Sequence, residues 1–192
     1  MKVLGITGGI ATGKSLVTKQ FKDRGFPVYD ADQIVHELYN NPSVIESITS
    51  RFPSVNDHGQ INRKALGELV FNDILAKSDL EQIFHPLVYE TLKTKINQHL
   101  SDPWVVLDIP LLYESGGEAL CDMVLVVYVD QKTQLKRLMD RNHLSESEAK
   151  SRIESQMPLH EKMERADIVI NNSGSVQKTL ERVNEIIEKV LI

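Results

Sequence analysis

Residues 8–15 read Gly8-Gly9-Ile10-Ala11-Thr12-Gly13-Lys14-Ser15 and fit the pattern G-x-x-x-x-G-K-[ST]. In this pattern the glycines let the backbone curl, so that successive N–H groups point at phosphate oxygens near the positive end of the following helix. Lys14 is then expected to meet the β- and γ-phosphates, while the hydroxyl of Ser15 supplies an oxygen to Mg²⁺. The stretch therefore predicts a phosphate-binding loop (P-loop) in a nucleotide-binding protein.

The flanking sequence provides the context that this motif needs. Residues 2–7 form a short apolar run that predicts a buried strand. After the loop, Leu16, Val17, Gln20 and Phe21 continue at helical spacing, and Gly25-Phe26-Pro27 marks the end of that helix. A strand, a glycine loop and a helix in this order favour nucleotide binding over a chance match.

Composition limits the possible classes of protein. The chain has 192 residues, enough for one domain with an elaboration, and its net charge of −5 argues against a general nucleic-acid binder. Its single cysteine, Cys121, cannot form an intramolecular disulfide and has no partner for a zinc site, and a buried apolar role is expected for it. The longest apolar run, residues 124–129, is too short to span a bilayer. We expect a cytoplasmic protein with no membrane or nucleic-acid partner.

The strand pattern predicts an α/β fold. Besides residues 2–7, short and nearly all-apolar runs occur at 27–29, 104–108, 123–129 and 167–170. Strands of this kind are typical of a parallel sheet that helices cover on both faces. The sequence thus predicts a P-loop NTPase fold with a five-stranded parallel sheet.

Helical patterns divide the remaining chain. Residues 133–142, a capping box at 145–148 opening a helix to 156, and residues 175–191 are predicted helices. Between the second and third strands there is no convincing strand, and helices are predicted at 33–39, 44–52, 64–74 and 80–99, the last with a bend at Pro86. We interpret 33–102 as a helical acceptor domain, 131–158 as a lid, and 1–32, 103–130 and 159–192 as the nucleotide-binding core.

Other motifs narrow the P-loop class. A GTPase is expected to carry an N-K-x-D motif after a late strand, but that place reads Ile170-Asn171-Asn172-Ser173-Gly174. Motor and AAA-type ATPases are larger than this chain. The small-molecule kinases remain.

The chain resembles the dephospho-CoA kinase family over almost its whole length. The residues that carry the resemblance are Leu4-Gly5-Ile6-Thr7-Gly8-Gly9-Ile10, Gly13-Lys14-Ser15, Asp30-Ala31-Asp32, Gly59-Gln60-Ile61-Asn62-Arg63, Leu66, Val70-Phe71, His85-Pro86, Asp108-Ile109-Pro110-Leu111-Leu112-Tyr113-Glu114, Arg137, Arg141, Arg152, Gln156, Ala166-Asp167, Ile170, Asn172 and Gly174. The resemblance implies phosphorylation of the ribose 3′-hydroxyl of dephospho-CoA by ATP, with Mg²⁺. Two departures, Ala11-Thr12 for a common Gly-Ser and Leu16 for a frequent Thr, remove no expected phosphate or metal contact.

Two acidic residues have expected roles, Asp32 in catalysis beside Lys14 and Arg141, and Asp108 in metal binding beside Ser15. Asp32 follows the second strand at the carboxyl edge, where open α/β sheets place ligands, and the resemblance favours it as the group that accepts the hydroxyl proton. Alternatively, Asp30 or Asp32 caps the helix that starts at Gln33. Asp108 ends an apolar strand and is expected to hold Mg²⁺, directly or through water. Its alternative role is a strand-end acid before the turn at Pro110.

The lid contributes arginines. Arg141 and Arg152 are the preferred candidates for the transferring phosphoryl group, because guanidinium groups bind phosphate oxygens bidentately. Arg137 lies four residues before Arg141 and can share its helical face, but an exposed surface role is more plausible for Arg137 than for the other two.

The remaining expected contacts follow the motif and the resemblance. ATP contacts are expected from Gly9, Ile10, Ala11, Thr12, Gly13, Lys14, Ser15, Leu16, Arg141, Arg152 and Asn172. The resemblance places Asn172 at the adenine, although residues 172–175 also suit a turn with an N-cap at Ser173 or Ser175.

The resemblance implies acceptor contacts from Asp32, Arg63, His85, Leu111 and Tyr113. Arg63 has the alternative of pairing with Asp57 or Glu68, and His85 that of a histidine at a helix kink.

Two other functions remain open from the sequence: a P-loop kinase for another small acceptor, and a nucleotide-binding module without turnover. The acceptor-domain motifs favour dephospho-CoA over the first. The joint presence of Lys14, Ser15, Asp32 and Asp108 argues against the second. The sequence leaves the oligomeric state open.

Overall fold

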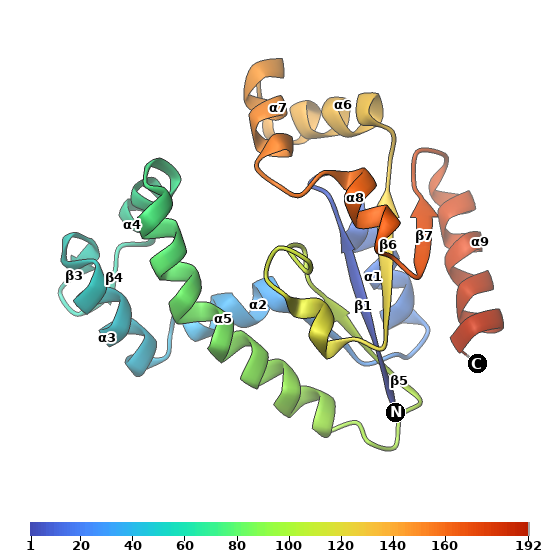
Figure 1. The fold of residues 1–192 in the computed structure, drawn as a ribbon, viewed down its shortest axis with the longest axis horizontal. Coiled ribbons are helices and arrows are strands. Elements are labelled where there is room, and N and C mark those ends of the chain that lie inside the picture. The colour runs from blue at the N-terminus through green and yellow to red at the C-terminus, as the bar shows by residue number, and fades with distance from the viewer. Residues whose placement is uncertain (192) are drawn as a thin grey trace. The chain divides into compact units, whose positions relative to one another are not determined.

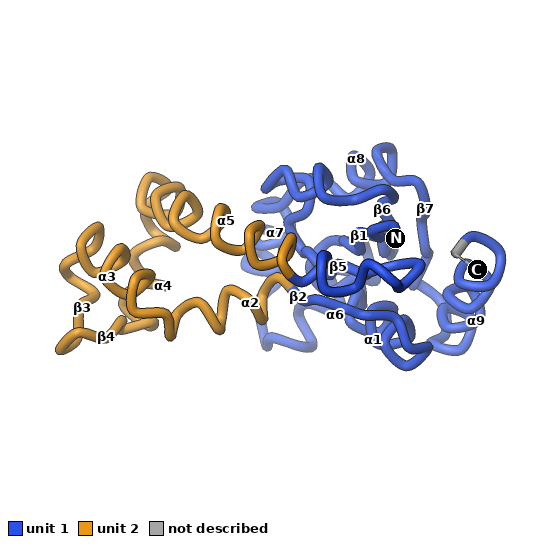
Figure 2. Tube along the Cα trace, turned by 90° about the horizontal axis from the view of Figure 1, so that it is seen from below, with its two compact units in different colours: residues 1–30, 95–192 blue, residues 31–94 orange. Residues whose placement is uncertain are grey.

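The computed structural model describes residues 1–191, with side chains described for residues 1–190. The chain forms two compact units, which Figure 2 colours separately. Unit 1 contains residues 1–30 and the chain from residue 95 on, and unit 2 contains residues 31–94. The helical segment expected at 33–102 corresponds mainly to unit 2. Asp32, expected in the core segment, also lies in unit 2.

Unit 1 is built on a five-stranded parallel sheet, which confirms the predicted fold class. Its strands are β1 (Lys2–Gly8), β2 (Val28–Asp30), β5 (Trp104–Asp108), β6 (Met123–Tyr128) and β7 (Ile168–Asn171). Their order across the sheet is β2-β5-β1-β6-β7 (Figure 1). The three central strands are almost entirely buried because both of their faces are covered.

One face of the sheet packs on α1 (Lys14–Asp23) and α9 (Val176–Ile186). The cluster between them is formed by buried side chains from all three layers, namely Leu4, Ile6, Val17, Phe21, Trp104, Val106, Leu125, Val127, Ile170, Val183, Ile186 and Ile187. The helix predicted to run to residue 191 changes to a π-helical turn, η3 (Ile187–Leu191), after Ile186.

The other face carries α8 (Leu159–Glu164) and the 3₁₀ helix η2 (Gly117–Leu120). Thr7 points to this face because side chains alternate along a strand, and its Oγ1 donates to the Pro110 carbonyl at 2.9 Å. The same carbonyl accepts a bond from Lys162 of α8 at 3.2 Å. Helices therefore cover both faces, as the apolar strands predicted.

Unit 2 is a small helical assembly with its own core. It contains α2 (Ala31–Leu38), α3 (Pro42–Arg51), the 3₁₀ helix η1 (Pro53–Val55), α4 (Arg63–Asn72) and most of α5 (Ile74–Asn97). Its core is formed by Val44, Ile48, Phe52, Val55, Leu66, Ala76 and Phe84. Pro86 lies inside α5, which runs as one continuous helix. Asp73 separates α4 from α5, and its side chain accepts from the Leu75 N–H at 2.8 Å.

The expectation of no strand in this segment is wrong. A two-stranded hairpin pairs β3 (Asn56–Asp57) with β4 (Gln60–Ile61). Its two turn residues, His58 and Gly59, both have positive φ (50° and 84°), as tight hairpin turns require. Each strand has only two residues, which is too short to produce an alternating sequence pattern.

The predicted lid forms two helices, α6 (Gln131–Asn142) and α7 (Glu146–Glu154). The capping box is confirmed: Ser145 and Glu148 bond reciprocally to each other's backbone N–H. The Ser145 hydroxyl, at 2.6 Å, and the Ser145 N–H, at 2.8 Å, both donate to the Glu148 carboxylate, and these two bonds lower the pKa of Glu148.

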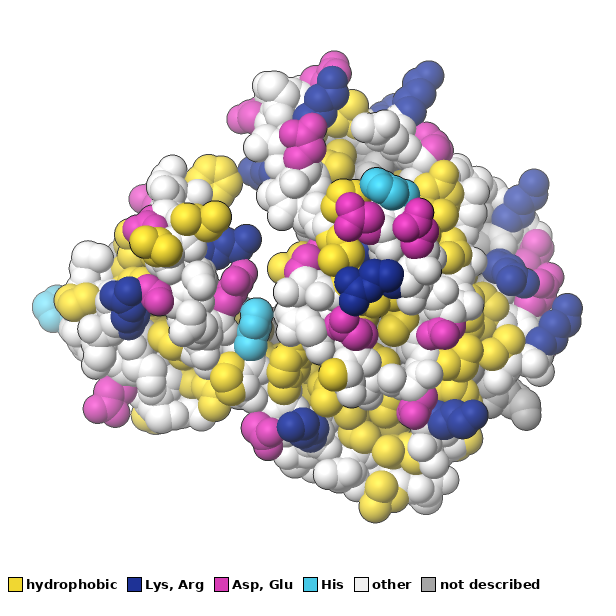
Figure 3. Space-filling view, viewed as in Figure 1, with side chains coloured by type: hydrophobic (Ala, Val, Ile, Leu, Met, Phe, Trp, Pro, Cys, Tyr) yellow, Lys and Arg dark blue, Asp and Glu magenta, His cyan; other side chains and the backbone are white. Residues whose placement is uncertain are grey.

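On the face that Figure 3 shows, acidic and basic side chains are interspersed. In unit 2, apolar side chains lie exposed where α4 ends and α5 begins: Phe71 is 82% exposed, Ile74 81% and Leu75 72%. Among the helices within residues 1–191, none has the length and apolar character needed to cross a membrane.

Cys121 packs against β1, since a Cβ on Gly5 would lie 2.6 Å from its Sγ. Burial, with smaller effects from Asp122 and Glu118, raises the pKa of the thiol from 9.0 to about 12. Because only the thiolate is nucleophilic, we predict that the folded protein reacts with iodoacetamide at pH 9.0 roughly five hundredfold more slowly than the unfolded chain. The folded pKa exceeds the unfolded one, so the stabilisation linked to this thiol is complete below pH 9.0 and declines above it. Equal rates in the two states would contradict this, and the single cysteine leaves no other thiol to contribute.

Candidate active site

The P-loop connects β1 to α1 and is held in a bent conformation. Gly13 precedes α1 with φ of 84°, and Ala11 has φ of 61°, a left-handed value that non-glycine residues seldom adopt. The buried side chain of Thr12 donates to the Gly9 carbonyl at 2.9 Å. The loop thus points its following N–H groups and the first turn of α1 toward one place, as anion binding requires.

Asn172, directly after β7, holds this loop through a hydrogen bond. Its Nδ2 donates to the Thr12 carbonyl at 2.8 Å, and its Oδ1 accepts from Thr179 at 2.8 Å. The side chain is only 4% exposed, and a Cβ on Gly13 would lie 2.2 Å from Nδ2. Asn172, expected to contact adenine, therefore contacts the backbone of the P-loop in this structure. Ser175, not Ser173, caps α9, and Ser173 accepts from the Asp130 N–H.

Two residues with separate expected roles meet directly. Lys14 and Asp108 form an ion pair, and Asp108 is 4% exposed at the end of β5. The pair follows from the sheet, in which Asp108 lies opposite Ile6 just before the P-loop. The sequence placed both residues near phosphate but did not predict their pairing, because the order of the strands was needed for that.

Mg²⁺ would find suitable ligands here. The hydroxyl of Ser15, exposed in the first turn of α1, and the carboxylate of Asp108 are oxygen donors, which Mg²⁺ prefers. Within residues 1–191 there is no cluster of three or more His, Cys, Asp or Glu that suggests a metal site made by protein ligands alone. This fits an ion held by few side chains together with phosphate oxygens.

The loop after β5 is fixed by a buried lysine that the sequence analysis did not identify. Lys162 of α8 is fully buried and pairs with Glu114 at 2.8 Å. Glu114 also accepts from the Met157 N–H at 3.0 Å, next to the end of the lid. Lys162 therefore joins α8, the lid's end and the loop that starts at Asp108. Its charged neighbours in sequence make it look like a surface residue, so only the fold shows its burial.

Leu111 and Tyr113 lie on this same loop but differ in exposure. Leu111 is 36% exposed, whereas Tyr113 is 7% exposed and Arg165 lies over its ring at 4.1 Å. Burial, only partly opposed by Arg165, raises the pKa of Tyr113. Of the two expected acceptor contacts, Leu111 has the more accessible side chain.

The lid arginines have a different arrangement from the one expected. Arg137, the least favoured candidate, extends to the P-loop: its Nη1 lies 3.9 Å from where a Cβ on Gly13 would be. Arg141 is exposed and its Nε donates to Asn142 at 2.8 Å, and Arg152 is exposed on α7. The tertiary structure therefore places Arg137, rather than Arg141 or Arg152, beside the loop.

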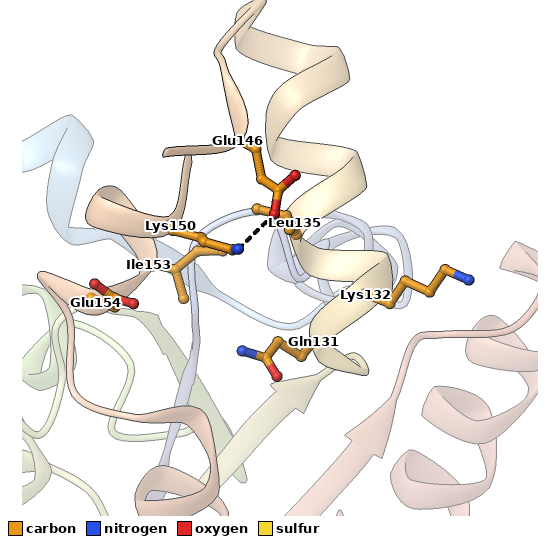
Figure 4. Close-up of a pocket in the computed structure, with 7 residues that line it drawn as sticks. All are labelled: Gln131, Lys132, Leu135, Glu146, Lys150, Ile153 and Glu154. Atoms are coloured by element: carbon orange, nitrogen blue, oxygen red, sulfur yellow. Dashed lines mark ion pairs between the residues drawn. The ribbon is translucent and has the colours of Figure 1, made fainter. Parts of the chain in front are cut away.

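A cavity of about 350 Å³ is lined by both lid helices (Figure 4). Its lining residues are Gln131, Lys132, Leu135, Glu146, Lys150, Ile153 and Glu154. Lys150 pairs with Glu146 at 2.6 Å, which raises the pKa of Lys150 and lowers that of Glu146. No P-loop residue belongs to this lining, so the cavity is separate from the phosphate site.

The acceptor-side candidates Asp32, Arg63 and His85 all lie in unit 2. Asp32 is in the first turn of α2, immediately after β2. Arg63 lies over the Tyr39 ring at 4.7 Å and contacts His36 at 3.3 Å and Asn40 at 3.4 Å, in place of the expected Asp57 or Glu68.

The ring of His85 in α5 stacks on Tyr89 with a 6.1 Å separation of the ring centroids. Unit 2 therefore presents a polar cluster of His36, Asn40 and Arg63 and, on α5, the His85–Tyr89 ring pair.

Comparisons with known proteins agree over nearly the whole chain. A family model described as dephospho-CoA kinase matches residues 2–178. The dephospho-CoA kinase of Latilactobacillus sakei is 45% identical, over 97% of this chain and 95% of that protein. A crystal structure of a Thermus thermophilus protein has a TM-score of 0.88 at 35% identity and covers 100% of this chain and 98% of its own. Dephospho-CoA kinase from Campylobacter jejuni has a TM-score of 0.75 at 32% identity, covering 98% of this chain and 96% of its own.

The contact between Gly13 and Asn172 gives a prediction with a matched control. Gly13→Ala should lose ATP binding, because its Cβ would displace Asn172 in addition to straining the backbone. Gly25→Ala has the same strain, at φ of 87°, but nothing lies within 4 Å of its added Cβ. The control should lose about 1–2 kcal/mol of stability and keep its ATP affinity. Calorimetric titration with ATP and thermal denaturation measure both effects, and equal ATP affinities would show that the Asn172 contact is unimportant.

Proposed function

The chain belongs to the dephospho-CoA kinase family, and we propose how its residues carry out that family's reaction. The reaction is the last step of coenzyme A biosynthesis, in which the ribose 3′-hydroxyl of dephospho-CoA is phosphorylated by ATP to give CoA and ADP. The observation that carries the function is the match over nearly the full length, in a chain whose P-loop lysine lies beside a strand-end carboxylate. Another small acceptor, or a module without turnover, is not favoured by that match.

On the nucleotide side, we propose that the backbone N–H groups of the P-loop and the first turn of α1 bind the phosphates. Lys14 exchanges its partner Asp108 for the β- and γ-phosphates when ATP binds. Ser15 and Asp108 are then positioned to hold Mg²⁺. When bound, Mg²⁺ neutralises charge on the phosphate oxygens.

On the acceptor side, we propose that unit 2 is the acceptor domain and that Asp32 takes the proton of the 3′-hydroxyl. The hydroxyl oxygen forms a bond to the γ-phosphorus as the bond to the ADP oxygen breaks, and the proton moves to the carboxylate. Arg63 and His85, with Leu111 and Tyr113 of unit 1, are the proposed acceptor contacts. The accessible guanidinium of Arg63 suits a phosphate group of the acceptor.

For the lid, residues 131–158, we propose that its three arginines, Arg137, Arg141 and Arg152, act at two different stages. Arg137 contacts the phosphates in the lid position that this structure shows, since its side chain already reaches the P-loop. Arg141 and Arg152 reach them only after the lid closes, which also excludes water from the phosphoryl group.

Asp32→Asn tests the proposed base. The substitution keeps the shape of the side chain but removes its basicity, so kcat should fall about 10²–10⁴-fold while ATP affinity stays normal. The measurement is ADP release that depends on added dephospho-CoA, with AMP and shikimate as competing acceptors that should give little ADP. Glu37→Gln, the same kind of change at an exposed site on α2, is the control. A normal kcat with a lower melting temperature would show that Asp32 only stabilises the start of α2 and is not the base.

Substitution of the lid arginines separates their two stages. Arg137→Ala should raise KM for ATP about tenfold, because it removes a contact made in the ground state. Arg141→Ala should lower kcat by roughly 10³-fold with little change in ATP affinity, because its contact forms at the transition state. Lys136→Ala, an exposed change on the same helix, is the control in steady-state kinetics. The opposite pattern would reverse the two assignments.

A further inference from the structure

Two glutamines hold a single residue of the P-loop. The Ile10 N–H donates to Oε1 of Gln156 at 2.8 Å, and the Ile10 carbonyl accepts from Nε2 of Gln134 at 2.9 Å. Both polar groups of one loop residue are therefore satisfied by side chains more than a hundred residues away in sequence. Neither of these contacts belongs to the general P-loop pattern, in which backbone and lysine act on phosphate.

The two glutamines lie at the two ends of the lid. Gln134 is in the first turn of α6, and Gln156 follows the end of α7 by two residues. The chain between them forms both lid helices, so the lid is hydrogen-bonded to Ile10 at both of its ends. We call these two ends, at Gln134 and Gln156, the stems of the lid. A movement of either stem must carry Ile10 with it or break a hydrogen bond.

Gln134 is closely fitted to the loop. It is 4% exposed, which is costly for an amide unless the amide is hydrogen-bonded. A Cβ on Gly9 would lie 2.7 Å from its Nε2, so a side chain at residue 9 would displace the Gln134 amide. The close approach makes Gln134 sensitive to the position of the P-loop backbone.

The loop also needs an external support at this point. Ala11, the residue after Ile10, is held at φ of 61°, where a side-chain-bearing residue costs about 1–2 kcal/mol relative to a right-handed conformation. Fixing the peptide groups on both sides of Ile10 opposes relaxation of this strain. Two hydrogen bonds of about 1 kcal/mol each are of the right size to do so.

Gln134 also shares a helix face with Arg137. Residues three apart on a helix are neighbours, and Arg137 is the lid arginine that reaches Gly13. Beside the two glutamines lies a cavity of about 490 Å³, whose lining includes Gln134, Gln156, Ile153 and Leu159. The stems of the lid therefore border open space here, and directed hydrogen bonds are needed to fix their position.

We propose that Gln134 and Gln156 form an amide clamp on Ile10 that positions the P-loop and Arg137 together for phosphate binding. Both are positioning residues, since they act through Ile10 and Arg137. The inference rests on the proposed phosphate contact of Arg137. It names two residues of the kinase reaction beyond those that the P-loop motif provides.

The same substitution at the two positions gives opposite expectations. Gln134→Glu replaces the N–H donor by a carboxylate that cannot donate to the Ile10 carbonyl, so kcat/KM for ATP should fall about tenfold or more. Gln156→Glu keeps an acceptor for the Ile10 N–H, so its kcat/KM should stay within about threefold of the wild type. Gln156→Met keeps the volume without the acceptor and should be impaired like Gln134→Glu. Gln131→Glu adds the same charge at an exposed site of α6 and controls for charge.

Two readouts separate positioning from a loss of stability. In the Gln134→Glu variant, the introduced carboxyl would be buried as Gln134 is, which raises its pKa, and it becomes a donor when protonated. Its kcat/KM relative to the wild type should therefore recover as pH falls from 7 to about 5.5. In the presence of ATP, amide exchange of residues 10–13 and of α6 should be faster in Gln134→Glu and Gln156→Met than in the wild type. Thermal denaturation checks that each variant is folded.

The outcomes distinguish the clamp from the proposed function. Normal kcat/KM and normal exchange in both Gln134→Glu and Gln156→Met, beside an impaired Arg137→Ala, overturn the clamp alone. Normal kinetics in Arg137→Ala overturn the phosphate role of Arg137 and, with it, this purpose of the clamp. If Gln134→Glu is unstable, Gln156→Met against Gln156→Glu decides the question, because Gln156 is only partly buried.

Discussion

The conformation of the P-loop at Gly13 is the constraint on which the nucleotide-binding unit depends. Gly13 must be left-handed and must lack a side chain, because Asn172 occupies the space beneath it. That asparagine comes from the end of β7, while the loop comes from the end of β1, with β6 between the two strands. The contact therefore requires three parallel strands in the correct register, which the pairing of β6 with both β1 and β7 provides.

Side chains from the sheet and from the lid hold the backbone of the P-loop in place. Asn172 bonds to Thr12 from the sheet, and Gln134 and Gln156 bond to Ile10 from the two ends of the lid. Lys162 adds a buried ion pair that joins α8 to the loop after Asp108. Each hydrogen bond contributes only about 1 kcal/mol, but together they fix one arrangement of a backbone that contains a strained Ala11. Phosphoryl transfer depends mainly on positioning and charge neutralisation, so supports of this kind bear directly on the proposed mechanism.

Charge is distributed so that the proposed phosphate site can exchange partners. Lys14 and Asp108 neutralise each other without nucleotide, which removes the cost of burying either charge alone. In the proposed exchange, a negative phosphate takes the place of Asp108 beside Lys14, and positive Mg²⁺ takes the place of Lys14 beside Asp108. The proposed base, Asp32, lies two residues after the end of β2, in the first turn of a helix that belongs to the other unit. The P-loop thus belongs to unit 1 and the proposed base to unit 2, and the chain passes from one unit to the other directly after β2.

The sequence by itself determined the P-loop, the five apolar strands, the capped lid helix and the family, because each depends on neighbouring residues or on ordered motifs along the chain. It missed the β3–β4 hairpin, whose strands are too short to show a period, and it left the site residues as expectations. Only the tertiary structure decided that Arg137 rather than Arg141 lies beside Gly13, that Asn172 and Gln134 contact the loop backbone, and that Lys162 is buried. These depend on contacts between residues far apart in sequence, and a side chain's partner across such a distance is set by strand order and helix packing, which local patterns do not encode.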